Sequence, residues 1–210
     1  MDDNASVATL REHKSPIILH IATHGYFLRH GDTLAELSSS PAVVIDKLTG
    51  MALLRHPLHR CGLVLAGANA WLVGADKKRT AADSLLTAAD AIELDLKGTE
   101  MVVLSACETG LGDVVSTKGV VGLRRMFAIA GARTVVASLW KVPDEATRAL
   151  MEAFYKYLIG GTPRSEALRK AKVDTRATHP HPMNWAGFIC LGDGGPLEEI
   201  RCGASSYESK

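Results

Sequence analysis

The fold is indicated first by two short apolar runs, Ile17-Ile18-Leu19-His20-Ile21-Ala22 and Met101-Val102-Val103-Leu104-Ser105-Ala106. Each run is rich in β-branched residues and nearly unbroken, which is typical of a strand covered on both faces in a parallel sheet. The first run stops at Thr23-His24-Gly25 and the second stops at Cys107. The sequence therefore predicts two buried strands, each followed by a side chain with acid–base or nucleophilic chemistry.

Further strands alternate with helices along the chain. Residues 133–139, 188–191 and 63–66 are three more candidate strands. Apolar residues spaced three or four apart predict helices over residues 120–130, from Pro143 to the stop at Gly160-Gly161, and from Thr162 as cap and Pro163 as first helical residue to the break at 179–182. Strands that alternate with helices predict an α/β domain with a mostly parallel sheet.

The composition excludes several classes of partner. The 210 residues carry 24 Lys and Arg against 23 Asp and Glu, so no net field attracts nucleic acid or an anionic membrane. No apolar run approaches the roughly 20 residues that a membrane-spanning helix needs. The four cysteines have no short spacing and no secretory leader precedes them, which favours a reducing cytoplasm over a disulfide scaffold. The absence of a Cys-x-x-Cys pair argues against a zinc site.

The chain divides into one domain and two flanking segments. We expect a lead-in over residues 1–14, the domain over residues 15–192, and a flexible tail over residues 193–210, where Gly and Ser accumulate. Residues 29–48 and 74–83 lack periodicity and are predicted to be loops.

His24 and Cys107 form a candidate catalytic pair. In open α/β sheets, functional groups gather at the carboxyl ends of the strands, so two parallel neighbours would bring these side chains together. A thiolate nucleophile with an imidazole base is what acyl transfer needs. The backbone amides of Gly25 and Cys107 are candidates for an oxyanion hole. Either residue alone has an ordinary structural explanation, since buried cysteines and packed or capping histidines are common.

An ordered series of motifs resembles the CHAT domain, the caspase-like domain found beside tetratricopeptide repeats. The resemblance spans residues 15–192 and rests on His20-Ile21-Ala22-Thr23-His24-Gly25, Val103-Leu104-Ser105-Ala106-Cys107-Glu108-Thr109-Gly110, Gly119-Val120-Val121-Gly122-Leu123-Arg124-Arg125, Ala130-Gly131-Ala132-Arg133, Ser138-Leu139-Trp140, Phe154-Tyr155, Glu166-Ala167-Leu168 and Trp185-Ala186-Gly187-Phe188. It implies a caspase-like three-layer sandwich, with His24 and Cys107 at the catalytic positions and no cofactor. CHAT domains usually carry further strands upstream of the His-Gly strand, so the sheet is expected to be incomplete on that side.

The resemblance also implies a substrate pocket. Leu139-Trp140-Lys141-Val142-Pro143-Asp144 is similar to an element of separase in which an aspartate helps to bind a basic residue before the cut bond. On this basis the pocket is assigned to Glu108, Ser138, Trp140 and Asp144. Asp144 equally suits the first turn of a helix, where a carboxylate is favoured by the helix dipole.

Two functions follow as hypotheses. The first is a cysteine endopeptidase that cleaves a specific protein partner, with a tetratricopeptide-repeat or other regulatory chain as a further partner. The second is a non-catalytic CHAT-like interaction domain or fragment. A nucleotide-binding protein is disfavoured, because no Gly-x-Gly-x-x-Gly or Gly-x-x-x-x-Gly-Lys-Ser/Thr motif opens a helix after a strand.

Overall fold

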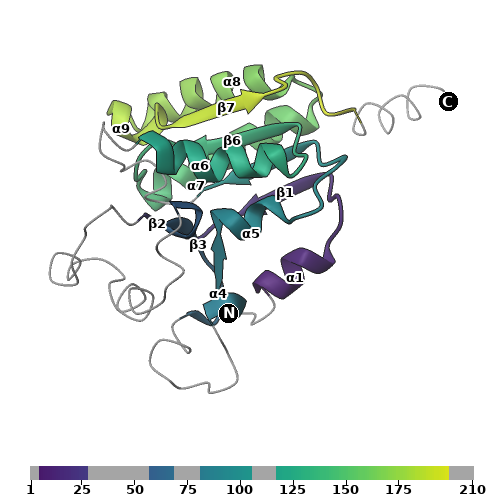
Figure 1. Cartoon of the computed structure of the whole chain (residues 1–210). Coiled ribbons are helices and arrows are strands. Elements are labelled where there is room, and N and C mark those ends of the chain that lie inside the picture. The colour runs from purple at the N-terminus through teal and green to yellow at the C-terminus, as the bar shows by residue number, and fades with distance from the viewer. Residues whose placement is uncertain (1–4, 28–56, 69–80, 106–116, 199–210) are drawn as a thin grey trace, which may run out of the picture.

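A mostly parallel four-stranded sheet forms the centre of the protein in the computed structural model, which describes residues 5–27, 57–68, 81–105 and 117–198 (Figure 1). The strand order is β1-β5-β6-β7. The strands are β1 (Ile18–Ile21), β5 (Met101–Leu104), β6 (Thr134–Ser138) and β7 (Phe188–Gly192). The first three run parallel and β7 is antiparallel to β6. The predicted pairing of the two runs is confirmed, because β1 and β5 are parallel neighbours with Ile18 beside Met101 and Ile21 beside Leu104.

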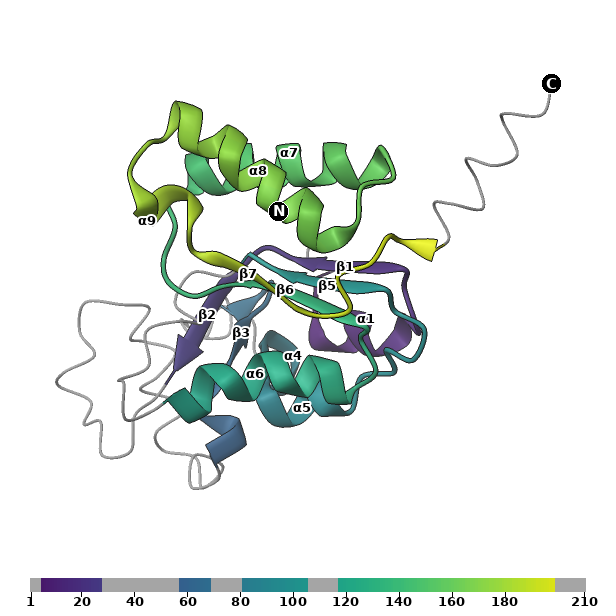
Figure 2. The ribbon, with the colours of Figure 1, turned by 90° about the horizontal axis from the view of Figure 1, so that it is seen from above.

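Helices cover both faces of this sheet and make a three-layer sandwich (Figure 2). One face carries α7 (Asp144–Ile159) and α8 (Arg164–Thr178), and the other carries α1 (Val7–Glu12), α5 (Ala88–Ile92) and α6 (Thr117–Ile129). Alternate residues of β5 explain the two layers. Val102 and Leu104 pack into the core on the α6 side, whereas Met101 and Val103 pack into the core on the α7 side. The all-apolar run is thus buried on both faces, as predicted.

The predicted helices are confirmed, with small changes at their ends. Helix α6 stops before Gly131, whose φ is +117°, and α7 ends at Ile159, with Gly160 as its C-cap. Helix α8 begins at Arg164, so Pro163 occupies the cap position rather than the first helical one, and Thr162 is not the cap. A further short helix, α9 (Pro182–Trp185), follows the predicted break.

The chain after the first strand differs from the prediction. Instead of leaving as a loop at Thr23-His24-Gly25, it forms β2 (His24–Phe27), which pairs antiparallel with β3 (Cys61–Val64). β3 in turn pairs with β4 (Leu85–Thr87), which completes a separate three-stranded sheet. The candidate strand over residues 63–66 therefore lies earlier, and it belongs to this second sheet.

The predicted loops and chain ends fall partly outside the described residues. The loop over residues 29–48 lies outside them. The last residues of the predicted loop 74–83 are helical, because α4 spans Ala81–Ser84. A short 3-10 helix, η2 (Pro57–His59), precedes β3. The domain boundaries at residues 15 and 192 stay a prediction, but packed residues lie beyond both. Val7 of α1 is part of the core, and Leu197 is buried, so the beginning of the predicted flexible tail is held against the domain.

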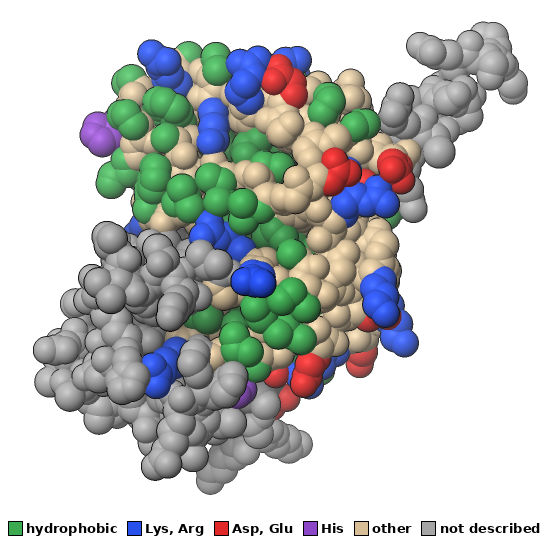
Figure 3. Space-filling model, turned by 45° about the horizontal axis from the view of Figure 1, so that its top comes forward, with side chains coloured by type: hydrophobic (Ala, Val, Ile, Leu, Met, Phe, Trp, Pro, Cys, Tyr) green, Lys and Arg blue, Asp and Glu red, His purple; other side chains and the backbone are tan. Residues whose placement is uncertain are grey.

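Charged side chains are mixed on the surface. On the face shown in Figure 3, basic and acidic side chains are scattered among apolar and uncharged ones. This pattern agrees with the near-zero net charge of the sequence. No helix among the described residues is long and apolar enough to cross a membrane.

Candidate active site

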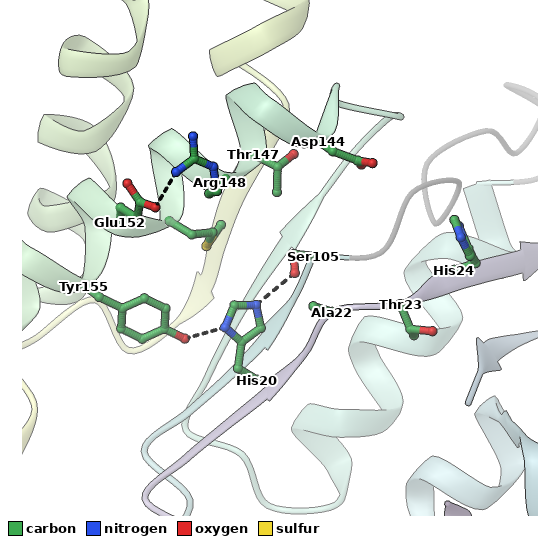
Figure 4. Close-up of a pocket in the computed structure, with 11 residues that line it drawn as sticks. His20, Ala22, Thr23, His24, Ser105, Asp144, Thr147, Arg148, Glu152 and Tyr155 are labelled. Carbon is green, nitrogen blue, oxygen red and sulfur yellow. Dashed lines mark hydrogen bonds and ion pairs between the residues drawn. The ribbon is translucent and has the colours of Figure 1, made fainter. Parts of the chain in front are cut away.

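A cleft of about 660 Å³ lies between the carboxyl ends of β1 and β5 and helix α7 (Figure 4). Its lining combines the sheet end with one face of the helix: His20, Ala22, Thr23, His24, Ser105, Asp144, Thr147, Arg148, Met151, Glu152 and Tyr155. Helix α7 turns Leu150 and Phe154 into the core, and the residues of α7 that line the cleft are polar except for Met151. The cleft therefore opens where an α/β sheet is expected to carry its functional groups.

His24 reaches this cleft from the first position of β2. It is exposed, and it lies opposite Val64 in the antiparallel pair. The Thr23 hydroxyl donates a hydrogen bond to the Val64 carbonyl, which ties the turn between β1 and β2 to β3. The adjacent Gly25 is buried in β2, opposite Leu63. The candidate base is thus placed by the second sheet as well as by the first strand.

Cys107 and Glu108 lie outside the described residues. The chain is described as far as Ser105, which follows β5 and lines the cleft. The Ser105 amide donates to the Ile21 carbonyl at 3.2 Å, which extends the β1–β5 pairing beyond the last strand residue. The nucleophile predicted from the sequence therefore follows this anchored residue by two positions.

Three of the predicted pocket residues belong to the described part of the chain, and only one of them lines the cleft. Asp144 is the first residue of α7 and lines the cleft. Ser138 is buried at the end of β6, and Trp140 donates through Nε1 to the Met183 carbonyl at 2.9 Å. Trp140 also packs against Gly187, where a Cβ atom would lie 3.0 Å from the indole. Asp144 thus shares the cleft with His24, whereas Ser138 and Trp140 are not among the residues that line it.

Three further polar residues of the cleft form a chain of hydrogen bonds that the sequence analysis did not single out. His20 Nε2 lies 2.8 Å from Ser105 Oγ, and His20 Nδ1 lies 2.9 Å from Tyr155 Oη. The surrounding protein lowers the pKa of His20 by desolvation, although one side of the ring is open to the cleft. Burial raises the pKa of Tyr155 to about 12, so its hydroxyl stays protonated.

The far end of the cleft carries an ion pair. Arg148 and Glu152 are one helical turn apart on α7, and their charged groups lie 3.0 Å from each other. Both side chains are largely exposed, so the pair contributes more to the charge pattern of the cleft than to stability. Within the described ranges, no three His, Cys, Asp or Glu side chains gather as a metal site would require.

The family model of the CHAT domain matches residues 1–193 of this sequence. The chain belongs to the CHAT domain family. Its α/β architecture, with a mostly parallel four-stranded sheet between helices, is the caspase-like fold expected from the motifs. The chain is also similar to tetratricopeptide repeat protein 28 of Mus musculus and of Homo sapiens, each 41% identical over 102 residues. That match covers 47% of this chain and 4% of each relative, so the chain spans a small part of the length of these proteins.

Proposed function

We propose that this CHAT domain is a cysteine endopeptidase that cleaves a protein partner, with His24 as general base and Cys107 as nucleophile. One observation carries the proposal: His24 and Ser105 line the same cleft, and Cys107 follows Ser105 by two residues. Chain connectivity alone keeps the α-carbons of Ser105 and Cys107 within about 7 Å of each other. The candidate nucleophile is therefore tethered to the wall of the cleft that His24 shares.

The proposed reaction is acyl transfer in two steps. His24 takes the thiol proton, and the Cys107 thiolate attacks the carbonyl carbon of the scissile peptide bond. The protonated His24 then gives its proton to the leaving amine, and a water molecule releases the acyl group and regenerates the thiol. The backbone amides of Gly25 and Cys107 are the proposed donors to the oxyanion.

The reactivity of the thiol tests the proposal directly. A cysteine activated by an imidazole reacts with iodoacetamide at mildly acidic pH, whereas an unactivated thiol does not. The chain contains two internal references, because burial raises the pKa of Cys61 to about 11 and also raises the pKa of Cys190. We expect mass spectrometry at pH 6 to find Cys107 alkylated well before Cys190. Equal labelling of the two, together with no cleavage of any protein partner, would favour the alternative, a non-catalytic interaction domain.

Substitution of the pair is the second test. Cys107→Ala and His24→Ala should each abolish cleavage, and the double variant should be hardly worse than either single one, because the two residues act as a unit. Near-wild-type cleavage by Cys107→Ala would refute the assignment. Retained thermal unfolding behaviour in each variant shows that the loss is chemical.

We further propose that Asp144 selects a basic residue at the cut position. It lines the cleft together with His24, and the carboxylate of an aspartate pairs well with arginine or lysine. Profiling with a peptide library should show a basic preference that Asp144→Asn loses. Glu145→Gln is the matched control, since Glu145 shares the first turn of α7 but does not line the cleft. An unchanged preference in Asp144→Asn would leave Asp144 as a helix-start residue only.

A regulatory chain with tetratricopeptide repeats is the proposed partner. The support is that both matched relatives are named as tetratricopeptide repeat proteins. Cleavage should change in rate when a tetratricopeptide-repeat chain is added to the purified domain, and an unaffected rate would count against this partner.

A reducing cytoplasm is the proposed location, because Cys107 must remain a free thiol to act.

A further inference from the structure

The hydrogen-bonded chain in the cleft joins three separate elements. Tyr155 comes from the C-terminal half of α7, His20 comes from β1, and Ser105 follows the end of β5 (Figure 4). The two contacts of the imidazole measure 2.9 Å and 2.8 Å, and they span 135 and 85 positions of the sequence. The His20 and Tyr155 rings also face each other, with centroids 5.6 Å apart. One side chain therefore touches both walls of the cleft.

The register of the sheet explains why these residues meet. His20 lies beside Val103 in the parallel pair, and Ser105, the first residue after β5, comes two positions later and faces the same side of the sheet. Val103 packs toward α7, so His20 and Ser105 face that helix as well. The contact is built into the pairing of β1 with β5, and it continues that pairing to the edge of the sheet.

We propose that His20 is a positioning residue of the cleft, which braces the end of β5 against helix α7 and thereby holds the backbone that leads into residue 107. This inference rests on the proposed function, because it assigns His20 a role in placing the nucleophile. The Ser105 amide is already bonded to Ile21, so the His20–Ser105 contact fixes this residue through its side chain in addition to its backbone.

A second interpretation of the Ser–His pair is less consistent with the geometry. A nucleophilic serine also lies within hydrogen-bond reach of a histidine, but there a carboxylate usually stabilises the imidazolium that forms. Here the neutral hydroxyl of Tyr155 takes that place. The Ser105 amide is also engaged in the sheet, so it does not serve an oxyanion. These features suit a rigid brace.

A neutral imidazole completes both contacts in either tautomer. One ring nitrogen donates a hydrogen bond to one hydroxyl, and the other nitrogen accepts a hydrogen bond from the second hydroxyl. Desolvation lowers the pKa of His20, and burial raises that of Tyr155, so both groups are neutral near pH 7. The brace therefore needs no charge and contributes orientation rather than electrostatic force.

Kinetics of three variants test the inference. His20→Gln, Ser105→Ala and Tyr155→Phe each weaken one or both contacts, and each should lower kcat by roughly 10- to 100-fold with little change in KM, since misplacement of a reacting group acts on the chemical step. Tyr157→Phe and Ser165→Ala are matched controls. Tyr157 on the same helix donates to Asp174 at 2.7 Å, and Ser165 donates to the Gly194 carbonyl at 3.1 Å, and neither residue lines the cleft.

A spectroscopic readout separates this inference from the proposed function. The ¹⁵N signals of the His20 ring should shift at Nε2 in Ser105→Ala and at Nδ1 in Tyr155→Phe, and the controls should leave both signals in place. Alkylation of Cys107 should slow in the same three variants even if the wild type cleaves no partner, in which case the proposed function fails and the brace stands. Wild-type values of kcat and of the alkylation rate in all three variants would overturn the brace and leave the proposed function untouched.

Discussion

Replacing Arg164 by methionine should destabilise the domain severely, because this side chain is fully buried and all its donors are used. Its partners lie on three separate parts of the chain: the Glu100 carbonyl at 2.7 Å and carboxylate at 3.1 Å, Thr134 Oγ1 at 2.9 Å, the Asp193 carboxylate at 3.3 Å, and the carbonyls of Gly195 at 2.9 Å and Pro196 at 3.0 Å. Arg164 therefore ties the segment after β7 to the sheet and to α8.

The expected loss of unfolding free energy follows from the buried groups that lose Arg164 as a partner. Removing one partner of a buried ion pair costs about 3–5 kcal/mol, because the other charge remains buried. Here Glu100 is buried and keeps an ion pair at 3.2 Å with Arg133, whose side chain is 43% exposed, and a hydrogen bond from the Glu198 amide at 3.4 Å. In a domain of this size each kcal/mol lowers Tm by about 2–4 °C, so the substitution should lower Tm by roughly 6–20 °C.

Thermal unfolding followed by circular dichroism measures Tm, and urea unfolding gives the corresponding midpoint. Arg169→Met is the matched control: Arg169 lies on the same helix and pairs with Glu166 at 2.7 Å, but it is exposed, so its loss should leave the midpoint nearly unchanged. If Arg164→Met does not fold, Arg164→Lys is the second variant. It retains the positive charge without the planar guanidinium group, and its midpoint should lie below that of the wild type. A midpoint for either Arg164 variant equal to that of the wild type would refute the reasoning.

Two further predictions concern Gly192 and His20. A Cβ atom at Gly192, whose φ is +93°, would overlap the Arg133 carbonyl. Gly192→Ala should therefore lower the urea midpoint by more than Gly161→Ala, because Gly161 also has a positive φ, +79°, but has open space around its Cβ position. Equal midpoints for the two variants would contradict this. Desolvation lowers the folded-state pKa of His20 below 6.5, so its contribution to stability is complete above pH 6.5 and declines as the pH falls through the folded-state value. His20→Gln should therefore lose less unfolding free energy than the wild type between pH 7 and pH 5, and parallel losses would show that protonation of His20 does not contribute to the pH dependence.

The central sheet was predictable because its signals are local. An apolar run such as that of β5 marks a strand buried on both faces, and a glycine such as Gly131 or Gly160 marks the end of a helix. The second sheet has only one such signal, the run over residues 63–66 that overlaps β3, and none marks β2 or β4. Strands β2, β3 and β4 are three or four residues long, and they pair across large separations in the sequence. Their pairing depends on tertiary contacts that periodicity does not encode.

The candidate site was predictable only in part, for a related reason. The rule that functional groups gather at the carboxyl ends of parallel strands brings His24 and Asp144 to one cleft. It does not separate Asp144 from Ser138 and Trp140, which lie at or just after the end of the same strand but do not line the cleft. Which side chains line a cavity depends on the direction of helix α7 and on contacts such as that of Trp140 with Gly187.

His20 shows what information was missing. A histidine inside an apolar run is a polar group in a strand that is otherwise suited to burial, and such a group requires hydrogen-bond partners. The sequence contains this signal but not the identity of the partners. Once the register places His20 beside Val103, the period of two in a strand puts Ser105 on the same face, and only the packing of α7 brings Tyr155 to the other ring nitrogen. A polar residue in a buried run therefore predicts a partner, and the strand register is what identifies it.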